Sequence, residues 1–327
     1  MTAARSLAGG LGRKVLRLAL TLFAVSVFTF LLTSLLPGDP AVTILGANGV
    51  TPEALNAIHK DLGLDKPLVS RYASWLGNVL HGDLGTSYSL DRSVASQINS
   101  HLPVTLEIIG LAIVIALVVA IPLGVFTAYK ASSAADRVIA LITFALLSIP
   151  TFVIGIVLIL VFAVHLDLLP PAGWVGLSED PVENLRRAIL PALALALPQI
   201  AVYTRLLRGD MRTTLDQDFV AFADAKGLSM RRVLLGHALR PSSFSLVTLV
   251  GLSVGFLMGG TVVVETMFNV PGIGSLLVNA IYQRDLVMVQ GVTLFIAVAF
   301  VLVNFVVDIL YSVLDPRIRR RRVAATV

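Results

Sequence analysis

The sequence predicts an all-α membrane protein with six transmembrane helices and with both termini in the cytoplasm. Of its 327 residues, 56% are hydrophobic and only 14% are charged, against about 25% charged in an ordinary soluble domain. The apolar residues form six stretches, each close to the roughly 20 residues that an α-helix needs to cross the hydrocarbon core. Lysine and arginine are unevenly shared between the connections, which predicts the orientation.

The first apolar stretch covers residues 15–36. It follows three basic residues, as a signal peptide does, but no A-x-A cleavage motif comes before Pro37. We expect this stretch to remain as a membrane anchor.

Five further spans follow, and we treat residues 1–327 as a single transmembrane domain. Pro122, Pro150, Pro191 and Pro198 should bend the helices that contain them, because proline removes a backbone donor. The five spans cover residues 103–129, 138–164, 188–207, 244–264 and 287–313.

Basic residues favour one side of these spans. The side that holds the N-terminus, the second and fourth connections and the C-terminus carries eighteen of the 25 Lys and Arg residues. The positive-inside rule places that side in the cytoplasm. Residues 37–102 then form an extracytoplasmic segment with short helical patterns at Pro52–Leu62 and Val69–Leu80, and residues 208–243 form a cytoplasmic segment.

Several kinds of chemistry are excluded by the composition. The chain has no cysteine, which excludes disulfides and thiolate sites. No lysine is followed by Ser or Thr, so a Walker A loop for ATP cannot occur, and no G-x-S-x-G elbow is present. The five histidines lack metal-ligand spacing. We therefore predict a non-catalytic chain without its own cofactor or metal.

The net charge of +5 does not indicate a nucleic-acid partner. Much of it lies beside the membrane spans, and the run Arg319–Arg322 is typical of a juxtamembrane anchor to acidic membrane lipid.

A few residues inside the spans could serve transport. Glu107 and Asp308 either contribute to a pathway or are helix-end residues wetted at the interface. Gly251, Gly255 and Gly259 place a small residue every four positions on one face of the fifth span. Such a stripe allows close helix packing, either within this bundle or against a second subunit around a pore.

The cytoplasmic segment contains a short helix with a clear stop. Phe219–Lys226 can form about two helical turns, Gly227 can take the left-handed conformation that ends them, and Ser229 can cap a new helix. Periodicity alone favours a plain surface connector that lies across the inner face of the membrane.

This same segment resembles the EAA loop of permease subunits of ATP-binding-cassette importers, in the branch for dipeptides, oligopeptides and nickel. In that family the loop is the coupling helix that docks on the ATPase. Ala221 and Phe222 replace the first Glu and Ala of the motif, and His237 and Arg240 replace its Ile and Pro. The residues that match the loop's positions are Phe222, Ala223, Asp224, Ala225, Lys226, Gly227, Leu228 and Ser229.

Further matches to the family run from about residue 12 to 318. Each is weak alone, but their order and spacing are specific. They lie at residues 36–41, 62–68, 75, 82–87, 102–107, 265–268, 271–274, 284–285, 289–291, 308 and 314–317.

The resemblance implies a type I importer permease fold and a defined set of partners. These are a second homologous permease subunit, two cytoplasmic ATP-binding subunits that hold ATP and Mg²⁺, and an extracytoplasmic solute-binding protein. We expect this binding protein to dock on residues 37–102 and 268–284, with Asp65 and Asp83 as candidate contacts. The substrate expected from the family is a short peptide.

Three alternatives stay open at this stage. Within the family, the substrate could be nickel or another small solute. From other classes, the chain could be an ion-coupled secondary transporter or a membrane scaffold.

Overall fold

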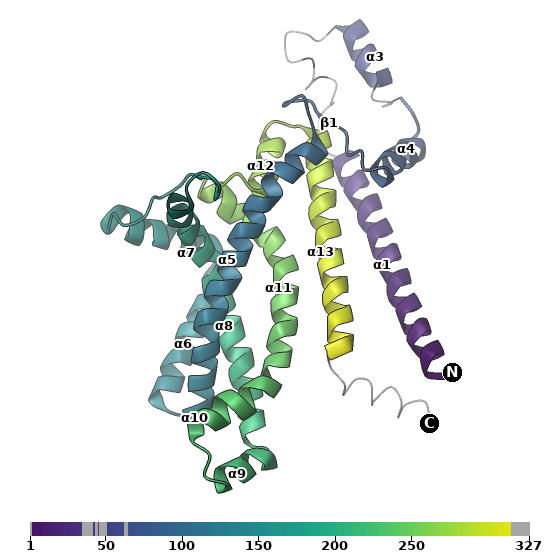
Figure 1. Ribbon diagram of the computed structural model, residues 1–327. Coiled ribbons are helices and arrows are strands. Elements are labelled where there is room, and N and C mark those ends of the chain that lie inside the picture. The colour runs from purple at the N-terminus through teal and green to yellow at the C-terminus, as the bar shows by residue number, and fades with distance from the viewer. Residues whose placement is uncertain (1, 35–41, 43–44, 46–50, 62–64, 315–327) are drawn as a thin grey trace. The chain divides into compact units, whose positions relative to one another are not determined.

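The computed structural model describes residues 2–34, 42, 45, 51–61 and 65–314. The motif at 36–41, residues 62–64, residues 315–317 and the basic run Arg319–Arg322 lie outside the described residues. The chain divides into two compact units, Met1–Val104 with Pro271–Leu302 and Thr105–Val270 with Val303–Val327. Each unit is described by itself (Figure 1).

The first unit combines the N-terminal third of the chain with a later segment. The helix patterns predicted in the extracytoplasmic segment are confirmed by α3 and α4. The elements are α1 (Thr2–Ser34), α3 (Pro52–Asp61), α4 (Leu68–Leu80), β1 (Thr86–Ser87), β2 (Arg92–Ser93), the start of α5 (Val94–Tyr129), α12 (Ile273–Tyr282) and most of α13 (Leu286–Leu314).

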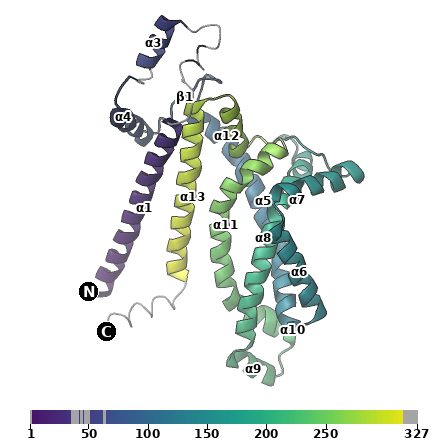
Figure 2. The ribbon, with the colours of Figure 1, turned by 180° about the vertical axis from the view of Figure 1, so that it is seen from behind.

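Helix α4 packs against the end of α1 (Figure 2). The hydroxyls of Ser26 and Tyr72 share a hydrogen bond of 2.8 Å. The Phe30 ring lies 5.4 Å from Tyr72 and 5.5 Å from Trp75, measured between centroids, a spacing at which aromatic pairs attract each other. This cluster holds α4 to α1.

The core of the first unit gathers residues that lie far apart in sequence. The start of α5, all of α12 and the start of α13 contribute its side chains. The buried members are Val94, Ile98, Ile273, Leu276, Ala280, Met288, Val289 and Val292.

The second unit is a bundle built around α8 (Figure 1). Small buried residues such as Ala192, Ala194 and Ala196 let α6, α7 and α11 pack closely against it. Its elements, besides the rest of α5, are α6 (Ala134–Ser148), α7 (Thr151–Leu158), the π-helix η1 (Ile159–His165), α8 (Pro181–Leu215), α9 (Asp218–Ala225), α10 (Met230–Arg232), the π-helix η2 (Val233–Ala238) and α11 (Leu239–Met267).

Within the described residues, five helices are long and apolar enough to cross a membrane, or six if one bent pair is a single span. That pair corresponds to predicted span 138–164. Its two parts, Ala134–Ser148 and Thr151–His165, meet at 105°. Pro150 explains the break, because the residue before a proline is pushed out of the helical region, and Ile149 is extended with ψ 126°.

The helices also extend beyond the apolar stretches. Helix α5 begins at Val94 rather than at residue 103, and α8 covers Pro181–Leu215 rather than 188–207. Pro191 and Pro198 lie inside α8 without ending it. Polar residues therefore continue these helices past the predicted limits of the spans.

The glycine stripe of the fifth span has unequal surroundings. A Cβ atom built on Gly251 would lie 2.5 Å from Cγ2 of Val307, so α13 packs closely there. Gly255 is buried, whereas a Cβ on Gly259 would meet no atom within 4 Å. Gly251 thus allows close helix packing within this chain, whereas Gly259 has no neighbouring atoms of this chain against it.

Candidate functional site

Helix α9 ends in the left-handed turn that the sequence predicts. Gly227 has φ +71°, and the Leu228 amide donates to the carbonyl of Ala223 over 3.3 Å. A bond from the second residue past the cap to the third residue from the helix end defines a Schellman motif. The prediction that Gly227 stops this helix is confirmed.

A small core holds α9 to the rest of the chain. Val220, Ala223 and Val233 are buried together. Leu215 and Leu228 pack against them, and the pairing of Leu228 with Ala223 is the apolar contact that usually accompanies a Schellman motif. Ala223, expected from the resemblance to meet the ATPase, is instead directed into this chain's own core.

A neighbouring face of α9 is exposed. Phe219 is 46% exposed and Phe222 is 62% exposed. Lys226 Nζ lies 4.5 Å from the centroid of the Phe222 ring. Residues three and four apart share a helix face, so these three side chains form one exposed ridge, which we call the α9 ridge.

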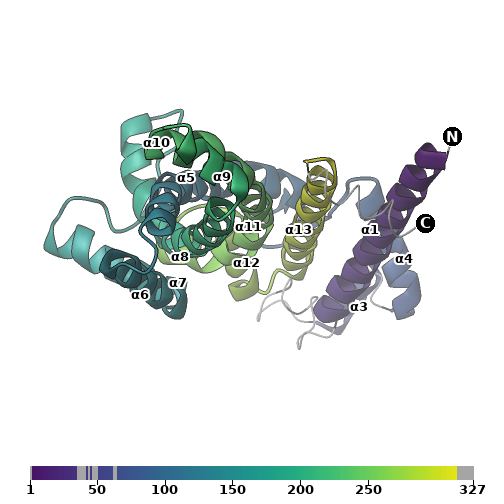
Figure 3. The same ribbon diagram turned by 90° about the horizontal axis from the view of Figure 1, so that it is seen from below.

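The short turn of residues 226–229 joins α9 to α10 (Figure 3). Ser229 stands at the start of α10, but its side chain makes no capping hydrogen bond, which differs from the prediction. Its carbonyl accepts from Arg232 and Val233 instead. Helices α10, η2 and α11 follow one another without a break, so the segment after α9 leads directly into α11.

An ion pair links α6 to α8, which leads into α9. Arg208 donates two hydrogen bonds of 2.7 Å to the carboxylate of Asp136. Asp136 is buried and also accepts from the Ser132 amide. Two parallel bonds of this kind fix geometry as well as charge. Sequence reasoning missed this pair, although both residues belong to the predicted cytoplasmic side.

A second polar centre lies in the first unit, at the start of α13. One oxygen of Asp285 accepts hydrogen bonds from the Ser87 hydroxyl and from the hydroxyl and amide of Ser89. The other accepts from the Met288 amide over 3.0 Å, which caps α13. Asp285 is 2% exposed, so its charge is stabilised by these donors. We call this arrangement the Asp285 clamp.

The clamp holds the loop between β1 and β2, which pair antiparallel. Tyr88 and Leu90 of this loop stay 39% and 43% exposed. Partial burial, and then the nearby charge of Asp285, raise the pKa of the Tyr88 phenol above its usual value, so Tyr88 is neutral at physiological pH. The loop therefore presents an aromatic and an aliphatic side chain on a fixed backbone.

The two candidate docking carboxylates, Asp65 and Asp83, are both exposed. Asp83 has a local role, since its Oδ1 accepts from the Gly85 amide over 2.8 Å. Gly85 has φ +87°, and a Cβ there would lie 2.8 Å from Val287 Cγ1. Charge reversal at Asp83 would therefore disturb a tight turn as well as the surface charge.

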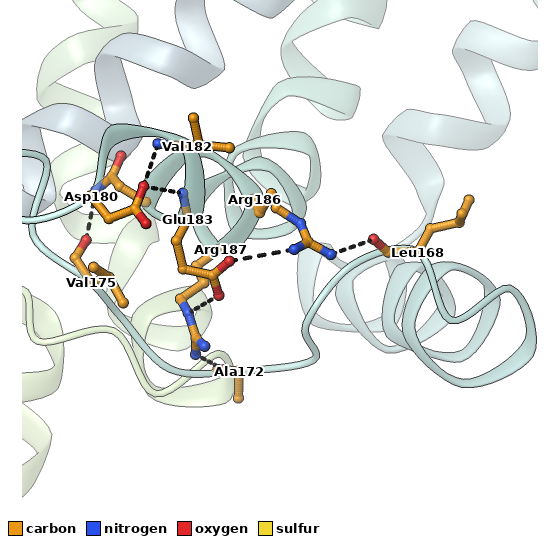
Figure 4. A network of polar contacts seen from close by, with 9 residues as sticks. Leu168, Ala172, Val175, Asp180, Val182, Glu183, Arg186 and Arg187 are labelled. Carbon is orange, nitrogen blue, oxygen red and sulfur yellow. Dashed lines mark hydrogen bonds and ion pairs between the residues drawn. The ribbon is translucent and has the colours of Figure 1, made fainter.

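A polar network organises the connection that precedes α8 (Figure 4). The Asp180 carboxylate caps α8 by accepting from the amides of Val182 and Glu183. Glu183 pairs with Arg187 at 2.8 Å and with Arg186 at 3.5 Å. The two arginines then donate to carbonyls of the preceding loop, at Ala172 and Leu168.

The acidic residues singled out inside the spans occupy different surroundings. Glu107 is half-buried on α5, and Asp308 is exposed on α13. The fully buried carboxylate of α11 is Glu265, which accepts from the Thr105 hydroxyl over 2.7 Å. Sequence reasoning placed Glu265 just beyond its predicted span and did not weigh it as an intramembrane charge.

No group of three or more His, Cys, Asp or Glu side chains in the described part of the chain could hold a metal ion. The arrangement found instead has two mechanical features, an exposed ridge attached to a membrane helix and a rigid loop held by a buried carboxylate.

Comparison with known proteins identifies related chains. A family model described as binding-protein-dependent transport system inner membrane component matches residues 120–320, and the N-terminal model of the same system matches residues 10–109. A Brucella abortus (strain 2308) protein named as a peptide transport system permease is 43% identical over 90% of this chain and 94% of its own length. The dipeptide transport system permease protein DppB of Escherichia coli (strain K12) is 34% identical over 92% of this chain and 96% of its own.

Proposed function

Because the chain belongs to the family of binding-protein-dependent transport system inner membrane components, we propose that it forms half of the translocation pathway of an ATP-driven importer of dipeptides and oligopeptides. It is a multi-pass protein of the bacterial inner membrane. The peptide substrate is supported by relatives named for peptide and dipeptide transport that match nearly the whole chain.

The proposed topology has six spans of a type I importer permease, with the bent pair Ala134–Ser148 and Thr151–His165 counted as one. An even number of spans puts both termini on the same side, and the distribution of Lys and Arg favours the cytoplasm for them. The α9 ridge then faces the cytoplasm, and the loop held by the Asp285 clamp faces outward.

The proposed complex contains a second homologous permease, two cytoplasmic subunits that bind ATP and Mg²⁺, and an extracytoplasmic solute-binding protein. This chain itself acts without catalysis. A bundle that alternates between inward and outward access needs an energy source that favours one state over the other, and the sequence contains no nucleotide-binding loop of its own.

The observation that carries the proposal is the α9 ridge. An exposed pair of phenylalanines on a two-turn helix is unfavourable in water and typical of a surface that docks. Its other face is anchored by Val220, Ala223 and Val233, so the ridge can insert into a cleft of an ATPase subunit without unfolding. Movement of that subunit would then pass through η2 into α11.

On the opposite side we assign the solute-binding protein to the exposed loop around Tyr88 and Leu90. The clamp keeps the loop in one conformation, which lowers the entropy lost on docking. Asp65 and Asp83 are neighbouring candidates for charged contacts at this surface.

The test of the proposed substrate is uptake by bacteria that lack only this chain. Loss of labelled dipeptide uptake with unchanged nickel uptake is expected, and dipeptide uptake should return to the parental level when the chain is supplied again. Loss of nickel uptake with unchanged dipeptide uptake would show that the cargo is the metal, as in the alternative within this family.

A further inference from the structure

An apolar groove runs along the C-terminal part of α5. It has a volume of about 330 Å³ and is lined by Ile121, Pro122, Val125, Phe126 and Tyr129 of α5 and by Leu234 and Leu235 of η2. Its wall is almost wholly apolar, with Pro122, Phe126 and Leu235 among the lining side chains. Phe126 is 44% exposed and Leu235 is 49% exposed, so the groove opens to the surroundings of the bundle.

Positive charge lies at one end of this groove. Tyr129 is the last residue of α5 and lines the groove. The ammonium of Lys130 lies 5.1 Å from the centroid of the Tyr129 ring, within the distance at which cations and aromatic rings attract each other. Lys130 therefore brings a positive charge to the end of the groove that Tyr129 lines.

We propose that this groove binds one acyl chain of an anionic phospholipid, with the headgroup phosphate held by Lys130. The groove is apolar along its length and has a positive charge at the end of α5. A phospholipid has the same arrangement, with an apolar acyl chain that ends in an anionic headgroup. Basic pockets between membrane helices bind anionic headgroups in this way. A helix of a partner subunit would fill the apolar part but would leave the basic end without an anion.

The position of the groove gives the lipid a consequence for the transporter. Leu234 packs into the groove wall from η2, which joins the α9 segment to α11. A bound lipid would therefore stabilise the element that carries motion from the α9 ridge into the membrane. The assignment to the cytoplasmic leaflet rests on the proposed topology, whereas lipid binding itself does not.

The test measures which lipid occupies the groove. Phe126→Trp is introduced into the full-length chain, the complex with its partner subunits is reconstituted into bilayers, and brominated lipids are used to quench tryptophan fluorescence. The fluorescence of the complex that keeps Phe126 is subtracted, which removes the contribution of the native tryptophans. Brominated phosphatidylglycerol is compared with brominated phosphatidylcholine at equal mole fraction. Leu235→Trp, on the other wall, serves as a second probe.

We expect phosphatidylglycerol to associate with the groove about fivefold more strongly than phosphatidylcholine, the effect of one basic group near an anionic lipid. Lys130→Gln should bring this ratio close to one, and Lys130→Arg should preserve it. A Val118→Trp probe, deeper on α5 and 67% exposed, should show no preference.

Equal quenching by both lipids at position 126, or a preference that Lys130→Gln leaves unchanged, would overturn the proposal. Quenching by neither lipid would also overturn it, because protein would then cover the groove.

Discussion

Replacing Phe222 by alanine should separate docking from folding. The residue is 62% exposed on the α9 ridge, and its side chain contributes nothing to the buried cluster of Val220, Ala223 and Val233. The exposed part of a phenylalanine amounts to roughly 120 Å², which at about 25 cal/mol per Å² is worth about 3 kcal/mol when buried in a partner. The variant should therefore bind the ATPase subunits about 100-fold more weakly.

The assay measures the affinity of the purified ATPase subunits for the full-length chain in bilayer discs, by titration. The amount of each variant in the membrane is measured alongside. Phe222→Ala should reach normal levels and lose ATPase binding. The matched control is Phe244→Ala, which removes another exposed phenylalanine, 49% exposed on α11, and should leave the affinity unchanged. An affinity of Phe222→Ala within threefold of the parent would refute the assignment of the α9 ridge to the ATPase contact.

Four further predictions follow from the same structure. Gly227→Val should weaken co-purification with the ATPase subunits, because a β-branched side chain at φ +71° costs roughly 1 kcal/mol or more, whereas Gly227→Asn should retain the co-purification. Equal binding by both variants would contradict the need for a left-handed turn. Asp285→Ala should reduce stimulation of ATP hydrolysis by the loaded binding protein while basal hydrolysis persists, since the loop loses its clamp; undiminished stimulation would place docking elsewhere. Asp136→Ala should lower the free energy of unfolding by about 2 kcal/mol, because it leaves a partly buried guanidinium unpaired, and an unchanged melting temperature would show that the pair is dispensable. Single cysteines at Ser70 and Ser229 should react with an impermeant thiol reagent on intact cells only at position 70; the reverse pattern would invert the topology.

Local features of the fold were predictable because they depend on neighbours in the sequence. The end of α9 at Gly227 and the break near Pro150 follow from backbone preferences of single residues. The 105° angle of that break does not, because both parts, α6 and α7, pack against the distant helix α8.

Features that join distant segments were beyond reach from one sequence. Nothing near Ser87 or Ser89 indicates that their partner is Asp285, almost 200 positions later. The motif around Ala223 also does not reveal which face of α9 is buried, since the same residues form the same short helix in either orientation. The residues of α9 could therefore be identified from the sequence. Which of them lie in the core and which lie on the surface became visible only in the structure.

The central claim is that this chain is a pathway subunit driven by ATP through partner subunits. It is tested most directly by dipeptide uptake into proteoliposomes that contain the chain, its partner permease, the two ATPase subunits and the loaded binding protein. The account predicts accumulation that requires ATP and Mg²⁺ and disappears when this chain is omitted, with no uptake by the chain alone under any imposed ion gradient. Ion-driven uptake by the chain alone, or ATP-driven uptake that persists without it, would contradict the account.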